Sequence, residues 1–87
     1  MAGRWTGTMG KIVIPAGSGA FTLKAGAVEF PARWVVPGKE FTWTDKQGKQ
    51  HKATLEANPK ATAEKPYRIR DVGEAYPDSP AYWYRVP

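Results

Sequence analysis

The sequence contains no cysteine and a single histidine, His51, among its 87 residues. Without cysteine, no disulfide can stabilise the fold and no thiolate cluster can hold zinc. One histidine among scattered carboxylates leaves no pair of residues at metal-ligand spacing, so the sequence predicts neither a metal nor a cofactor. A serine–histidine–acid triad would have to combine the same His51 with Ser18 or Ser79. These shortages favour a protein that is not an enzyme.

Long apolar runs are also missing. The longest runs of large apolar residues are three residues long, as in Ile12–Ile14 and Trp34–Val36. None approaches the length of a membrane-spanning helix or of the apolar region of a signal peptide. The sequence therefore predicts no membrane partner, and it leaves the compartment open, with virion and cytoplasm both compatible.

Large aliphatic side chains are scarce. Leucine, isoleucine, valine and phenylalanine together account for fewer than one residue in five. A share below roughly 20% signals disorder when the net charge is high. Here the net charge is only +5, and eleven aromatic residues are present, each able to remove roughly 150–250 Å² from water. We therefore expect a folded domain with a thin core that neighbours complete, through self-association or a protein partner.

Nine glycines and eight prolines separate short runs rich in β-branched and aromatic residues. This spacing is typical of all-β proteins. We predict one domain, residues 1–87, folded as a small sandwich or barrel of about six to eight short, mainly antiparallel strands joined by Gly/Pro turns. The expected strands are Lys11–Ile14, Ala20–Lys24, Ala27–Phe30, Ala32–Val36, Glu40–Thr44, Gln50–Ala57, Tyr67–Asp71 and Ala81–Val86.

The segment Asp45–Lys49 predicts a hairpin turn. An aspartate that starts a type I turn, followed by a glycine in the left-handed conformation, forms a three-residue hairpin loop with a bulge. That register places Trp43 opposite His51. It also gives the hairpin one apolar face, made of Phe41, Trp43, Ala53 and Leu55. Because one register satisfies both the turn and the apolar face, we expect this pairing in the structure.

Two C-terminal strands carry arginine beside aromatic residues. Period-two alternation puts Arg68 and Arg70 on one face of the first strand, and Trp83 and Arg85 on one face of the second. If the strands are neighbours, these four side chains form one exposed patch suited to a protein partner or to single-stranded nucleic acid. The other interpretation places Trp83 in the core and leaves the arginines merely solvated.

The basic excess is spread along the chain. The N-terminal segment 1–28 contains Arg4, Lys11 and Lys24 and no acid. The hairpin tip holds three lysines without an acid, Lys46, Lys49 and Lys52. Such a tip would contact phosphate or an acidic protein surface, or it would simply keep the hairpin soluble.

From these observations we predict a non-enzymatic structural or interaction protein that packs into a homo-oligomer or a larger particle, for example as a phage virion decoration or tail accessory protein. Exposed aromatics and strand edges would make the contacts. The alternative is a small basic β-barrel that binds nucleic acid through an Arg/aromatic face. The expected partner-binding residues are Arg68, Arg70, Trp83, Arg85, Lys46, Lys49 and Lys52.

Overall fold

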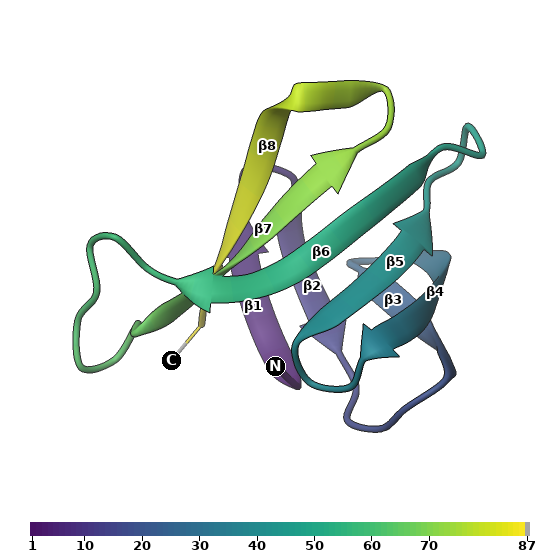
Figure 1. Cartoon of the computed structure of the whole chain (residues 1–87). Helices are drawn as coiled ribbons and strands as arrows, with labels where there is room; N and C mark the ends of the chain where they lie inside the picture. The colour runs from purple at the N-terminus through teal and green to yellow at the C-terminus, as the bar shows by residue number, and fades with distance from the viewer. Residues whose placement is uncertain (87) are drawn as a thin grey trace.

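In a computed structural model that describes residues 1–86, the chain forms a closed antiparallel barrel. The strands follow one another around the barrel in chain order, and the last one returns to pair with the first (Figure 1). The prediction of a small all-β sandwich or barrel is confirmed, and the structure is a barrel. The strands of residues 1–86 are β1 (Gly3–Gly7), β2 (Gly10–Ile14), β3 (Ala20–Ala25), β4 (Val28–Val36), β5 (Glu40–Thr44), β6 (Gln50–Ala57), β7 (Tyr67–Gly73) and β8 (Tyr76–Arg85). No helix in this range is long and apolar enough to cross a membrane.

The β5–β6 hairpin has the bounds and the register that the sequence predicts. Trp43 pairs with His51, and Phe41 pairs with Ala53. The turn closes through a hydrogen bond from the Asp45 amide to the Lys49 carbonyl, 2.9 Å long. Both predicted strand bounds, Glu40–Thr44 and Gln50–Ala57, are confirmed.

The bounds of β2, β3 and β7 differ from the predicted ones by one or two residues, and three other elements differ more. Strand β1 was not expected, and β8 begins at Tyr76, five residues earlier than expected. The two strands expected on either side of Pro31 are one continuous strand, β4. Pro31 pairs with Thr22 of β3, whereas the pairing of β4 with β5 starts only at Ala32. Pro31 therefore lies where β4 has a single neighbour, a position at which the missing proline N–H is tolerated.

The core fills the barrel interior with aromatic side chains. All four tryptophans are buried, and the ring centroids of Trp34 and Phe41 lie 5.4 Å apart in an edge-on arrangement. The buried apolar residues are Trp5, Ile12, Ile14, Leu23, Trp34, Phe41, Trp43, Ala53, Ile69 and Trp83. Large aromatics thus compensate inside one chain for the shortage of aliphatic residues.

The two ends of the barrel differ. The short turns after β1, β3, β5 and β7 lie at one end, which we call the hairpin end (Figure 1). The opposite end holds the N-terminus and the connections after β2, β4 and β6, including the strand-free segment 58–66 between β6 and β7. The number of paired residues also differs between neighbouring strands: β2 and β3 share a single register pair, Val13 with Lys24.

Candidate binding surface

Strand β7 alternates as predicted, with Arg68 and Arg70 directed outward. Their neighbour Ile69 is fully buried, and it pairs with Trp83 of β8. Trp83 consequently points into the barrel and is 1% exposed. The expectation of an exposed patch containing Trp83 is therefore wrong, because closing the barrel puts this face of β8 inside.

Three outward aromatics lie on β8, Tyr76 at its start and Tyr82 and Tyr84 near its end, and none of them was singled out from the sequence. In the register, Arg68 pairs with Tyr84 and Arg70 pairs with Tyr82. Both tyrosines are half-buried. The signal for them was present, since they occupy the positions that alternate with Trp83, but the sequence did not reveal which set faces outward.

Arg68 is held in place by two contacts. Its Nε donates to Glu56 Oε2 at 2.7 Å, and its guanidinium carbon lies 3.8 Å from the centroid of the Tyr82 ring. Arg70, between Thr54 and Tyr82 in the register, is exposed and has no ion pair within residues 1–86. Arg70 is therefore the more available of the two cations.

The outward row continues from β8 onto β1, β2 and β3. Tyr84 pairs with Thr6, and Thr6 pairs with Lys11. Val13 pairs with Arg4 on one side and with Lys24 on the other. We define the basic belt as the outer surface of these consecutive strands that carries Arg70, Arg68, Tyr82, Tyr84, Arg4, Lys11 and Lys24.

Few acids lie on the strands of the basic belt themselves, although Glu56 of β6 bonds to Arg68 and Glu29 of β4 pairs with Lys24 at its two edges. Of the acids on β7, β8, β1, β2 and β3, Asp71 points into the barrel and Asp78 lies near the start of β8. The acid-free segment 1–28 accounts for this, because it contributes three of the five cations. Strands from the two ends of the chain meet where β1 pairs with β8 (Figure 1), which brings the cations of both onto one outer surface.

The remaining predicted site residues are distributed around the barrel. Lys52 lies on β6 opposite Val72, diagonal to Arg70 and so beside the basic belt. Lys46 and Lys49 are exposed at the tip of the β5–β6 hairpin. Arg85 does not join the belt.

Arg85 instead covers one end of the core. Its guanidinium carbon lies 4.4 Å from the Trp5 ring centroid, and its Nη1 donates to the Ala2 carbonyl. The side chain therefore packs over the indole and ties the last strand to the N-terminal segment.

His51 is held between two carboxylates. Its Nδ1 lies 3.1 Å from Asp71 Oδ2, and its Nε2 lies 2.9 Å from Asp45 Oδ2. The ring stacks on Trp43 at 3.9 Å between centroids, and the Trp43 indole donates to Asp71 Oδ1 at 2.8 Å. Burial raises the pKa of Asp71, whereas the hydrogen bond with His51 lowers the pKa of Asp45. Both ring nitrogens are engaged, so this cluster ties the hairpin to β7.

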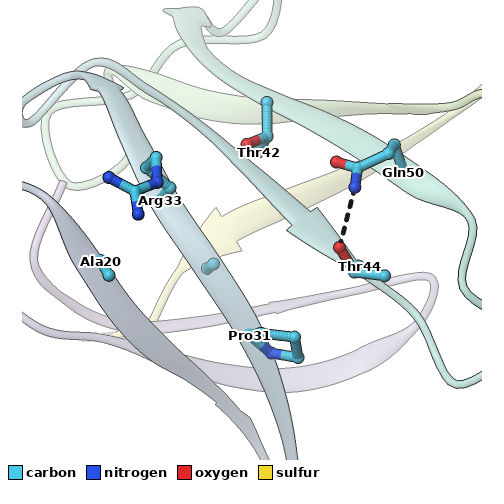
Figure 2. Close-up of a pocket in the computed structure, with 7 residues that line it drawn as sticks. Ala20, Pro31, Arg33, Thr42, Thr44 and Gln50 are labelled. Carbon is cyan, nitrogen blue, oxygen red and sulfur yellow. Dashed lines mark hydrogen bonds between the residues drawn. The ribbon is translucent and has the colours of Figure 1, made fainter.

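A shallow hollow lies on the outside of β3–β6, away from the basic belt. It is lined by Ala20, Pro31, Ala32, Arg33, Thr42, Thr44 and Gln50 (Figure 2). Gln50 Nε2 donates to Thr44 Oγ1 at 3.0 Å across its floor. The hollow offers one cation and a few neutral polar groups, a weaker binding surface than the belt.

Comparisons of the chain with protein-family models, with curated proteins and with solved structures returned no match. The function must therefore be inferred from the geometry of the barrel.

Proposed function

We propose that this protein is a non-enzymatic binding protein that takes single-stranded nucleic acid on its basic belt. The observation that carries the proposal is the continuous outer row of five cations and two tyrosines over consecutive strands. Cations in a row attract the phosphate backbone, and aromatic rings beside them stack with unpaired bases.

The charges of the belt are available for such a contact. Arg4, Lys11, Lys24 and Arg70 are all exposed. None of the four has an ion pair within residues 1–86. Arg68, already bonded to Glu56, would instead hold Tyr82 in position. Because binding releases counterions from the nucleic acid, affinity should fall steeply as the salt concentration rises.

The proposal is tested by fluorescence anisotropy with a labelled oligo-dT of about 20 nucleotides at several salt concentrations. Replacing both belt cations in Arg70→Ala/Lys11→Ala should weaken binding about tenfold and reduce the slope of log K against log salt by about 1.4. The control is Arg33→Ala on β4, an exposed arginine outside the belt. The loss of binding free energy in Arg33→Ala should be less than half of the loss in the belt variant.

Two results would contradict the proposal. The first is no binding of oligo-dT by the unmodified protein at low salt. The second is an equal loss of affinity per charge in the Arg33 variant and in the belt variant, since that would indicate net charge rather than a defined surface. Circular dichroism of each variant establishes that the barrel is intact.

A second candidate function is packing into a homo-oligomer or a larger particle, such as a virion. The observation in its favour is the adjacent exposed pair Val35 and Val36, 53% and 45% exposed, at the end of β4. Because the barrel is closed, such association would use side-chain surfaces and not strand edges. Light scattering should then show an oligomer that Val35→Ser/Val36→Ser dissociates. A monomer at every concentration would argue against this function.

A further inference from the structure

A second hollow lies on the basic belt itself, where β1, β2 and β3 follow one another around the barrel. Its volume is about 280 Å³. Three cations of the belt line it, Arg4, Lys11 and Lys24, and of the residues that the structure describes no acid lines it. Val13, which is 43% exposed, and the half-buried Val86 add an apolar surface beside the cations. We call this place the seam hollow.

Within residues 1–86, the seam between β2 and β3 leaves backbone groups of β2 without a strand partner. The Val86 amide donates to the Arg4 carbonyl at 3.0 Å, so the backbone polar groups of Arg4 face away from β2. Arg4 and Val13 therefore form a non-hydrogen-bonded pair, and alternation directs the N–H and C=O groups of Val13 and Lys11 towards β3. Val13 has Lys24 as its partner there, but the register ends at this pair, and Lys11 has none on β3.

The seam hollow begins where the next pair would form. Gly26 lies two residues beyond Lys24, in the β3–β4 turn, and it lines the hollow together with Lys11. The hollow thus combines a backbone donor and acceptor with an apolar surface and three cations. A nucleotide has matching parts: a base with apolar faces and a hydrogen-bonding edge, and a phosphate. The volume is near the lower limit of ligand pockets, roughly 300 Å³, which suits one base and not two.

We propose that the seam hollow takes one nucleobase of the strand bound on the basic belt, with the neighbouring phosphates on Arg4, Lys11 and Lys24. This inference rests on the proposed function and adds a defined position at which a base is bound. A free phosphate would use the cations alone and would leave the apolar surface in water. Glu29 pairs with Lys24 from β4 but does not line the hollow, so the three charges remain available to the phosphates.

The first test locates the base directly. Intermolecular Overhauser contacts are measured by NMR at saturation with oligo-dT of about 20 nucleotides. Thymine base protons should show contacts with the methyl groups of Val13 and Val86. They should show none with Val35 and Val36, which are exposed at the end of β4, outside the belt.

A variant without a change of charge separates the base from the backbone. Val13→Ser should weaken oligo-dT binding about three- to fivefold, because the base loses apolar contact. The dependence of affinity on salt should stay the same, because no cation is removed. An abasic strand with the same number of phosphates should bind equally well to Val13→Ser and to the parent protein. Val35→Ser, at an exposed valine outside the belt, is the control and should alter neither affinity.

The outcomes distinguish this inference from the proposed function. Oligo-dT that binds without Overhauser contacts to Val13 and Val86 would overturn the inference and leave the basic belt intact as a binding surface. Equal affinity of folded Val13→Ser and the parent protein for oligo-dT would do the same. A failure of oligo-dT to bind at low salt would overturn both. The Overhauser measurement uses the unmodified protein, so it decides the question even if Val13→Ser does not fold.

Discussion

At the scale of single residues, Asp71 places a carboxyl group in the buried interior of the barrel. Its side chain is 2% exposed, and its two oxygens are met by the Trp43 indole and the His51 ring. Burying a carboxylate is unfavourable unless hydrogen bonds compensate, and here two are formed. The net effect is still a raised pKa, because loss of hydration outweighs both hydrogen bonds.

This raised pKa gives Asp71→Asn a distinctive pH dependence. A carboxyl whose folded pKa lies above its ordinary 3.8 binds a proton more readily in the folded protein than in the unfolded chain. Its contribution to stability is therefore greatest below pH 3.8 and declines as the pH rises through the raised pKa. The asparagine variant lacks this decline, so its free energy of unfolding should increase relative to that of the parent protein from pH 3 to pH 7. Urea unfolding at several pH values measures the difference.

Asp45 supplies a control of opposite sign. Its pKa is lowered from 3.8 by the hydrogen bond with His51, so its contribution is present above that value and is lost as the pH falls through the lowered pKa. The free energy of unfolding of Asp45→Asn should therefore lie furthest below that of the parent protein at neutral pH. If the free energy of unfolding of each variant differed from that of the parent protein by the same amount at all pH values, the cluster of His51, Asp45 and Asp71 would have no electrostatic role.

At the scale of elements, the β5–β6 hairpin is the part of the fold that depends most on local sequence. Asp45 Oδ1 accepts hydrogen bonds from the amides of Gln47 and Lys49, both at 2.9 Å. Gly48 adopts a φ of 79°, in the left-handed region that glycine occupies without strain. The groups that form the turn thus lie within five residues, and the apolar face of the two flanking strands agrees with the same register, which is why the sequence predicts this hairpin correctly.

Replacing Gly48 by alanine should destabilise the barrel by about 1–2 kcal/mol, because a side chain in the left-handed conformation is strained. No neighbouring atom lies within 4 Å of the new Cβ, so the cost would come from the backbone alone. Gln47→Ala, at the exposed neighbouring position, is the control and should be nearly neutral. Thermal unfolding measures both, and an equal effect of the two substitutions would contradict this account of the turn.

Other elements could not be predicted because they depend on distant partners. β1 has only one large apolar residue, Trp5, and becomes a strand by pairing with β2 on one side and β8 on the other. For β8, alternation grouped Trp83 with Arg85 correctly but did not reveal which face is internal. The three cations of the segment 1–28 were visible in the sequence. Their union with Arg68 and Arg70 required closure of the barrel between β8 and β1.

At the scale of the whole molecule, closure protects every strand edge, but the seams between strands are unequal. β6 and β7 are joined by seven register pairs and β3 and β4 by six, whereas β2 and β3 share only Val13 with Lys24. Fewer ladder pairs leave fewer hydrogen bonds to break when the seam opens. The barrel should therefore open first between β2 and β3, while both neighbouring seams remain paired.

Hydrogen exchange followed by NMR tests this order of opening. Amides of β3 that point to β2 should exchange faster than those that point to β4, although both sets belong to one strand. A disulfide in Val13→Cys/Lys24→Cys should slow exchange at the seam and stabilise the protein by about 2–3 kcal/mol, because it closes a short loop across the only register pair there. The reduced form of the same variant is the control, since it carries the substitutions without the crosslink. Uniform exchange along both edges of β3, or equal rates in the oxidised and reduced forms, would show that the barrel opens elsewhere.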